Sequence, residues 1–188
     1  MTVEELKKEC VAKKIYSYGT AQIFKKRQQD YAKKIKRITL LGLFSPVFIG
    51  ASVASFSAEN DVVKFLVIPF CGLVTIFQAL LSLRSIVYKW DDEYSYSMTS
   101  VAVNTRLTNE YESLAKKSEI EIIARLPVLN SEYQIQEAAD NQRNITDSEV
   151  RYGMRSALFQ YKCKCGTCNN VPRDLNPTNC DTCGNFFK

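Results

Sequence analysis

Five of the seven cysteines lie in the last 26 residues, and four of these form two CxxC pairs, Cys165 with Cys168 and Cys180 with Cys183. Eleven residues separate Cys168 from Cys180. Each pair can present two thiolates to one ion, and the spacer lets the chain return to complete a tetrahedron. Four soft thiolates suit zinc or, less often, iron. The spacing therefore predicts a structural Zn²⁺ site, because four protein ligands leave no position open for water or substrate.

Other uses of the cysteines remain open. The four thiols could form disulfides, although a reducing cytoplasm, which the charges predict for this tail below, disfavours them. A redox role is also conceivable, but one CxxC pair would suffice for it. Cys163 could replace Cys165 as a ligand, yet its spacing to Cys168 is poor for a metal knuckle. We therefore treat Cys163 as a spare thiol.

The chain has no histidine among its 188 residues. This excludes Ser-His-Asp triads, Cys-His dyads and zinc sites with histidine ligands. The sequence also shows no phosphate-binding loop, nucleophile elbow or paired-carboxylate site. We therefore expect that the protein is not an enzyme and has no small-molecule substrate.

Basic and aromatic residues surround the cysteine pairs and could bind nucleic acid. Basic groups would contact phosphates, and aromatic rings would stack on bases. A contact between subunits is the alternative use of this surface. The candidate ligand-binding residues are Arg151, Tyr152, Arg155, Phe159, Lys162, Lys164 and Arg173.

The elements that position these residues are expected to be helices. Residues 91–124 contain no Pro or Gly, and their apolar residues recur along one stripe. This pattern predicts one long helix that Pro127 ends. Residues 128–145 are interpreted as a short polar helix between loops.

The helix before the cysteines has a clear start signal. Thr146 and Glu149 form a capping-box pattern, which predicts a helix that runs to about Lys162. The expected organisation is therefore a helical region over residues 88–162, followed by a four-cysteine zinc knuckle over residues 163–188.

The first 37 residues are strongly basic, with 11 Lys and Arg against four Asp and Glu. Their apolar residues recur with an imperfect helical period, and Thr2 followed by two glutamates suits a helix start. We expect a basic amphipathic helix over residues 1–37, broken near Gly19. It would contact anionic headgroups or form the basic rim of an oligomer.

Two stretches, residues 38–56 and 65–83, carry no charge over 19 residues each. A helix needs about 20 apolar residues to cross the hydrocarbon core of a bilayer. These stretches predict a transmembrane hairpin over residues 38–87 and an all-α membrane protein. The alternative, two buried core helices of a soluble protein, would need more apolar material than the rest of the chain supplies. The mean hydropathy of −0.19 averages these spans with a polar remainder.

Charges beside the spans predict the orientation of the hairpin. The connection at residues 57–61 is acidic, whereas the outer flanks are basic. By the positive-inside rule, both termini are cytoplasmic. The flanking cations are Lys33, Lys34, Lys36 and Arg37 before the first span and Arg84 and Lys89 after the second.

Small and polar residues recur along the second span at intervals of three or four. They are Gly72, Thr75, Gln78 (or Ala79) and Ser82. Such a face favours helix packing within a hairpin or oligomer, or it lines a pore made by several copies. Gln78 is costly in lipid without a partner or water, which favours an oligomeric or wet setting. Pro46 and Pro69 are expected to kink or loosen their spans.

The CxxC-x11-CxxC tail behind a two-helix membrane segment resembles the bacterial family described as mobilome CxxCx(11)CxxC proteins. Residues 1–124 also resemble the SLATT group of two-transmembrane effectors. Residues 91–117 resemble the helix that follows the hairpin in that group, with Asn104-Thr-Arg-Leu and Tyr111-Glu-Ser-Leu-Ala at the familiar spacing. Only the four cysteines carry over residue by residue.

The SLATT resemblance implies a role in bacterial conflict systems, often beside nucleotide-producing enzymes. It implies a homo-oligomeric pore in the bacterial inner membrane that serves anti-phage defence by abortive infection, as in a Hailong-type system. A nucleotide or DNA oligomer made by a nucleotidyltransferase would gate it from the cytoplasmic side. A tetramer is our expectation from general channel architecture. The alternative hypothesis is a membrane-anchored nucleic-acid-binding or scaffold protein of a mobile element.

Overall fold

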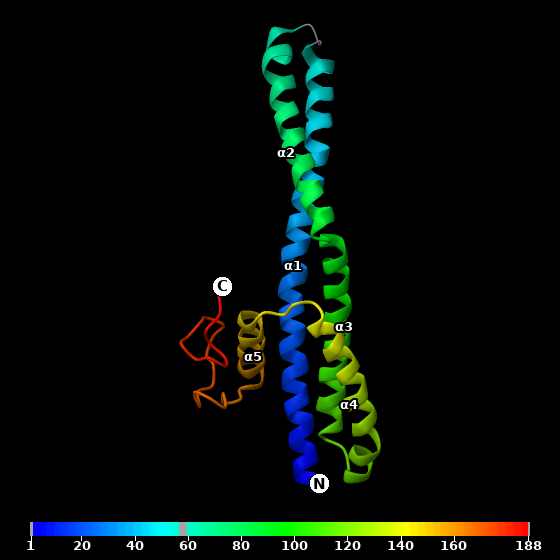
Figure 1. The fold of residues 1–188 in the computed structure, drawn as a ribbon, viewed down its shortest axis with the longest axis vertical. Coiled ribbons are helices and arrows are strands. Elements are labelled where there is room, and N and C mark those ends of the chain that lie inside the picture. Colours follow the sequence, from blue (N-terminus) through cyan, green and yellow to red (C-terminus); the bar gives the residue numbers. More distant parts are fainter. Residues whose placement is uncertain (1, 57–59, 188) are drawn as a thin grey trace. The chain divides into compact units, whose positions relative to one another are not determined.

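The computed structural model describes residues 2–56 and 60–187, and every regular element in these ranges is helical (Figure 1). The all-α prediction is therefore confirmed. The five α-helices are α1 (Val3–Phe56), α2 (Ile68–Val87), α3 (Trp90–Leu114), α4 (Glu119–Asn141) and α5 (Asp147–Tyr161), and a π-helical turn, η1 (Val63–Val67), precedes α2.

The chain divides into two compact units. The bundle unit consists of Met1–Arg27 and Tyr96–Lys188, and the hairpin unit consists of Gln28–Ser95. The hairpin unit extends beyond the predicted spans because flanking side chains also pack within it. For example, the Lys34 ammonium lies 5.3 Å from the centre of the Trp90 ring.

The core of the bundle unit is formed by α1, α3 and α4, each of which contributes apolar side chains at helical spacing. Tyr111 is fully buried at its centre, and its hydroxyl donates to the Leu129 carbonyl at 3.2 Å. Figure 1 shows these three helices side by side and α5 against the opposite side of α1. The buried core residues are Leu6, Cys10, Leu107, Tyr111, Leu114, Ile122, Leu126, Leu129 and Tyr133.

The boundary between α3 and α4 corrects the predicted helix over 91–124. α3 ends at Leu114, and α4 begins after Ser118, whose backbone N–H donates to the Glu121 carboxylate at 3.1 Å. This is a capping box, which starts α4.

Pro127 does not end a helix, and the short polar helix expected within residues 128–145 is not a separate element. α4 runs through Pro127, although proline inside a helix costs about 3 kcal/mol. The cost is offset by a stripe of four buried side chains that spans both sides of Pro127. They are Ile122, Leu126, Leu129 and Tyr133.

The expected break near Gly19 is also wrong, because α1 continues through it. Gly19 instead marks the point where α5 crosses α1. A Cβ atom on Gly153 of α5 would lie 2.7 Å from the Gly19 carbonyl oxygen, and one on Gly19 would lie 3.0 Å from the Gly153 carbonyl oxygen. Two glycines therefore allow the helix backbones to touch, which larger side chains would prevent.

The predicted start and end of α5 are confirmed. The Glu149 backbone N–H donates to the Thr146 hydroxyl at 3.3 Å, and the Thr146 backbone N–H donates to the Glu149 carboxylate at 2.8 Å. The helix ends before Lys162, which adopts a left-handed conformation with φ of 54°. This end directs the chain into the cysteine segment.

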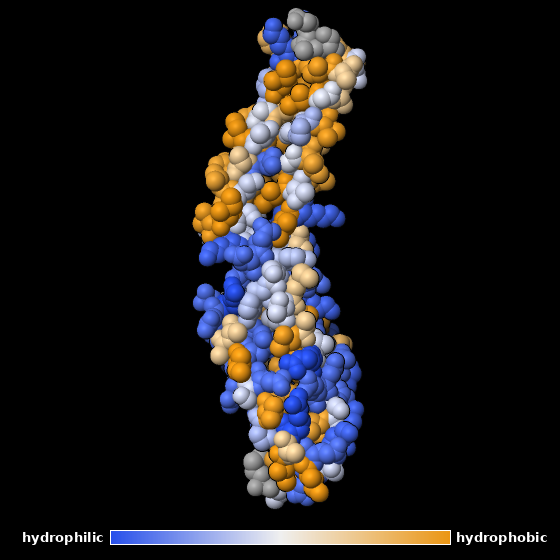
Figure 2. All heavy atoms as spheres, turned by 90° about the vertical axis from the view of Figure 1, so that its right-hand side faces the viewer, coloured by the Kyte–Doolittle hydropathy of each residue, from blue (hydrophilic) through white to orange (hydrophobic). Residues whose placement is uncertain are grey.

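The hairpin unit packs α2 against the C-terminal part of α1. Gly42 of α1 lies against the side-chain amide of Gln78, because a Cβ atom on Gly42 would be 2.6 Å from Gln78 Nε2. α1 continues through Pro46, and Pro69 lies in the first turn of α2. Figure 2 shows hydrophobic side chains over most of the visible face of the two apolar helices in this unit. Both helices are long and apolar enough to span a membrane.

Candidate metal centre

The four cysteines of the two CxxC pairs converge on one point, and their Sγ atoms all lie within 4.8 Å of one another. The Sγ atoms of Cys165 and Cys180 are 3.9 Å apart, as are those of Cys168 and Cys183. In a zinc tetrahedron with Zn–S distances of about 2.3 Å, adjacent sulfurs are about 3.8 Å apart. The donor set and its spacing therefore fit a zinc ion, which would lie between the four sulfurs.

The two CxxC pairs form matching turns. The Asn169 N–H donates to the Cys165 carbonyl at 2.9 Å, and the Gly184 N–H donates to the Cys180 carbonyl at 2.8 Å. Thr167 and Thr182, which occupy the same position in each pair, place their hydroxyls 2.6 Å apart. The turns thus contact each other through equivalent residues as well as through the sulfurs.

Position 184 must be glycine because a side chain would not fit there. A Cβ atom there would lie 2.9 Å from the Cys180 backbone nitrogen and would also collide with the Thr178 hydroxyl. The equivalent position after the first pair is Asn169, which has a positive φ of 57°. Asparagine tolerates that conformation better than most residues. The two turns therefore use different residues to reach similar hydrogen bonds.

Cys163 does not belong to the converging group. Its thiol lies 3.5 Å from the Tyr161 carbonyl, and its side chain packs against the cluster from outside. The four ligand candidates are those predicted from the CxxC spacing, and Cys163 does not replace Cys165 among them.

The thiols differ in their acidity in the absence of metal. Backbone N–H groups of Cys183 and Thr182 lower the pKa of Cys180 to about 7. Burial, followed by hydrogen bonds with the other thiols, raises the pKa of Cys183. A bound dication favours the thiolate form of every ligand, so binding releases protons and weakens at low pH.

Two arginines of α5 hold the cysteine segment. Arg155 is 6% exposed and donates to the Asp174 carbonyl at 2.9 Å, to the Asp174 carboxylate at 3.1 Å and to the Cys183 carbonyl at 3.4 Å. Arg151 donates to the carbonyls of Asp181 and Asn185 at 2.7 and 3.2 Å. These two candidates for ligand binding therefore have partners within the chain.

The other candidate ligand residues divide into contacts within the chain and exposed cations. Tyr152 packs edge-to-face on the buried ring of Phe186, with the ring centres 5.7 Å apart. The Lys162 ammonium lies 4.3 Å from the centre of the Phe159 ring. Lys162, Lys164 and Arg173 are exposed and remain candidates for contact with an anion.

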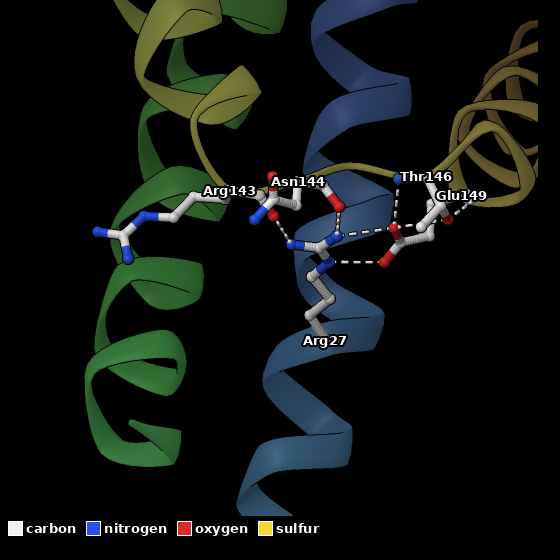
Figure 3. A network of polar contacts seen from close by, with 5 residues as sticks. All are labelled: Arg27, Arg143, Asn144, Thr146 and Glu149. Carbon is white, nitrogen blue, oxygen red and sulfur yellow. Dashed lines mark hydrogen bonds and ion pairs between the residues drawn. The ribbon is translucent and has the colours of Figure 1, made fainter. Parts of the chain in front are cut away.

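An ion pair joins α1 to the start of α5 (Figure 3). The Arg27 guanidinium donates to both Glu149 carboxylate oxygens, at 2.6 and 2.7 Å. It also donates to the carbonyls of Arg143 and Asn144, at 2.8 and 3.1 Å. Burial acts to raise the pKa of Glu149, but hydrogen bonds from Arg27 and Thr146 together outweigh it and hold the pKa below its usual value. The sequence indicated the cap of α5 but gave no sign of this partner 122 residues away.

The candidate pore-lining residues lie on α2 in different surroundings. A Cβ atom on Gly72 would meet open space, and the Thr75 hydroxyl donates to the Cys71 carbonyl of its own helix at 2.8 Å. Gln78 lies against Gly42 of α1, and Ser82 is half-buried. Thr75 and Gln78 therefore have contacts inside one hairpin.

Comparison with known proteins finds a family whose model matches most of the chain. The family model described as "Mobilome CxxCx(11)CxxC protein" matches residues 7–186, which include all four converging cysteines and all of the helices apart from the first turn of α1. No curated protein and no solved structure matches the chain. Because the match extends over nearly the whole chain, the protein belongs to the mobilome CxxCx(11)CxxC family.

Proposed function

We propose that this protein is a two-span effector of the bacterial inner membrane that assembles into a homo-oligomeric pore. The observation that carries the proposal is the exposed apolar surface of the hairpin unit. Only 6% of the residues in the most apolar stretch of α1 or of α2 are buried. Core helices of a soluble protein would be mostly buried, so this surface favours lipid or further copies of the chain.

The charges at the ends of the hairpin support an orientation with both termini in the cytoplasm. Cations flank the first span on its N-terminal side and the second span on its C-terminal side, whereas the connection between the spans is acidic. Cytoplasmic loops carry the excess of Lys and Arg. The cysteine segment would then lie in a reducing compartment, which favours metal binding over disulfides.

The bundle unit would act as the signal-receiving part of the effector. The cysteine segment is attached to α5, and α5 is attached to α1, so the zinc knuckle would stiffen this region. The exposed Lys162, Lys164 and Arg173 supply the positive charge that a nucleotide or DNA oligomer requires. Membership of a mobilome family and the SLATT resemblance both support a role in anti-phage conflict. The subunit number that we propose is four.

Ion flux through the assembled protein tests the proposal. The full chain, loaded with zinc, is reconstituted in liposomes with an entrapped ion-sensitive fluorescent dye, and ion leakage into the liposomes is followed after addition of a short DNA oligomer or a nucleotide. We expect leakage that depends on the signal and that changes when Thr75→Ala and Gln78→Leu are combined. Leu80→Ile, which conserves an exposed apolar position on the same helix, is the control. Liposomes that stay sealed under every signal would contradict a pore.

The second candidate is a membrane-anchored nucleic-acid-binding or scaffold protein. The contacts of Thr75 with its own helix and of Gln78 with Gly42 favour it, because a polar residue satisfied inside the hairpin does not need a wet pore. In this case the hairpin variants leave all measured properties unchanged. Binding of oligonucleotides would instead weaken with salt and with loss of Lys162, Lys164 and Arg173.

A further inference from the structure

We infer that the bundle unit contains a binding cavity for a small organic cation, enclosed mainly by α1, α4 and α5. The cavity has a volume of about 260 Å³. Every residue that lines it belongs to the bundle unit, so the inference does not depend on the proposed pore. None of the cysteines or candidate nucleotide-binding cations lines it.

One of the residues that line this cavity is a buried carboxylate. Asp140 is 2% exposed and is a lining residue. Its Oδ1 accepts hydrogen bonds from the hydroxyls of Tyr96 and Ser100, both at 2.8 Å, and from the Gln136 amide at 2.9 Å. Its Oδ2 accepts from the Asn104 amide at 2.8 Å. These four donors are neutral. One cation lies nearby, because the Arg143 guanidinium is 4.0 Å from the centre of the Tyr96 ring, but Arg143 is not a lining residue of the cavity.

A second carboxylate lies one helical turn away. Glu137 also lines the cavity, and it accepts a hydrogen bond from the Tyr133 hydroxyl at 2.8 Å. Two carboxylates three residues apart on one helix face repel each other. A cation in the cavity would relieve that repulsion and form charge-assisted hydrogen bonds.

The remaining lining residues indicate the chemical character of the rest of the ligand. No Lys or Arg is among the described residues that line the cavity, and Lys13, which lies 3.9 Å from the centre of the Tyr133 ring, is not a lining residue. The walls are aliphatic and aromatic, with side chains that include Ile15, Ile23, Ile145, Val150, Met154 and Tyr16.

The ligand that fits is therefore an amine with an apolar body. At about 30 Å³ per water, a cavity of this size holds about nine waters, or a ligand of about ten non-hydrogen atoms. The same carboxylates disfavour a nucleotide, whose phosphates would face like charge without a cation in the lining. Any nucleotide signal would thus bind elsewhere on the protein.

Ile145 lies in the connection between α4 and α5, and Arg27 holds the neighbouring carbonyls of Arg143 and Asn144 (Figure 3). One wall of the cavity is therefore held in place by the α1–α5 ion pair. Because α1 and α5 both contribute lining residues, an occupant would contact both helices.

Calorimetric titration of the full chain, loaded with zinc in detergent, tests the inference with three probes that share a phenylethyl group. They are 2-phenylethylamine, the neutral 2-phenylethanol and the anionic 3-phenylpropanoate. We expect saturable binding of the amine at millimolar concentration or below, at least about tenfold tighter than the alcohol, and no binding of the anion. An amine that does not bind, or that binds no better than the alcohol, overturns the inference.

Two variants locate the site without disturbing the buried Asp140. Glu137→Gln removes one charge while its carbonyl oxygen still accepts from Tyr133, and Thr20→Leu fills part of the cavity from α1. Each is expected to weaken amine binding at least about fivefold. Glu119→Gln removes the same charge from α4 outside the cavity and should leave binding unchanged. If all three variants bind the amine equally well, the amine binds outside this cavity and the inferred location is wrong.

Discussion

Apolar and polar side chains have opposite environments in the bundle unit and in the hairpin unit. In the bundle unit, Leu107 and Tyr111 are fully buried, and the buried Asp140 accepts four hydrogen bonds from neighbouring side chains. In the hairpin unit, Leu73 is 68% exposed, and the Thr75 hydroxyl turns back to its own helix. The bundle unit completes its core within one chain, whereas the hairpin unit leaves most of its apolar side chains exposed.

Loss of the metal is expected to have the largest effect. Cys183→Ser removes one of the four candidate ligands, and metal binding to a structural zinc site supplies about 10–16 kcal/mol of apparent free energy in small domains. The cysteine segment should lose its fold while α1, α3 and α4 stay assembled. Zinc content by mass spectrometry and proteolysis of the segment measure the result. Cys163→Ser, the control, should retain one zinc per chain.

A matched pair of charge substitutions tests the difference between the two units directly. Leu73 in the hairpin unit and Ile135 in the bundle unit are 68% and 70% exposed. Leu73→Asp should cost about 3–4 kcal/mol of insertion free energy if α2 spans a bilayer, because the favourable contribution of Leu is lost and that of Asp is unfavourable. Ile135→Asp should cost less than about 0.5 kcal/mol because its side chain lies in water. Alkaline extraction of membranes should release Leu73→Asp but not Ile135→Asp. If both variants were released, or neither, the two exposed positions would not differ in environment as we expect.

Breaking the ion pair between α1 and α5 is expected to have a smaller effect. Arg27→Met should lower the free energy of unfolding by about 2 kcal/mol, because it leaves a partly buried carboxylate without its charged donor. The pKa of Glu149 lies below its usual value, so the pair stabilises the fold above the unfolded pKa of about 4.3 and loses this contribution as pH falls through the folded pKa.

Denaturation of wild type and of Arg27→Met should therefore converge at acidic pH. Zinc loss at low pH lowers the free energy of unfolding of both proteins, so its effect cancels when one value is subtracted from the other. A gap in unfolding free energy that persists below the folded pKa of Glu149 would show that packing, not charge, explains the variant.

The smallest effect is expected at the glycine contact between α1 and α5. Gly153→Ala places a methyl group 2.7 Å from the Gly19 carbonyl oxygen and should destabilise the bundle unit by about 1–2 kcal/mol. Gly50→Ala in the hairpin unit meets open space and should leave helicity unchanged or raise it. Thermal melts followed by circular dichroism compare the two. A neutral Gly153→Ala would contradict the close approach of α5.

Local signals in the sequence predicted several features correctly. The CxxC spacing identified all four converging cysteines, and the Thr146 capping box located the start of α5. The same kind of signal, Ser118 followed by Glu121, marks the start of α4, whereas Pro127 lies inside that helix. A capping box fixes a helix boundary locally, whereas the cost of one proline can be offset by packing elsewhere.

The sequence by itself determined the all-α class, the two apolar helices and the four cysteines suited to a metal ion, because helical periodicity, span length and ligand spacing are short-range properties. Only the tertiary structure decided which side chains meet across the chain. It paired Arg27 with Glu149, assigned Arg151 and Arg155 to the cysteine segment, and enclosed Asp140 beside a cavity. These pairings depend on how helices distant in sequence cross, and no local pattern encodes that geometry.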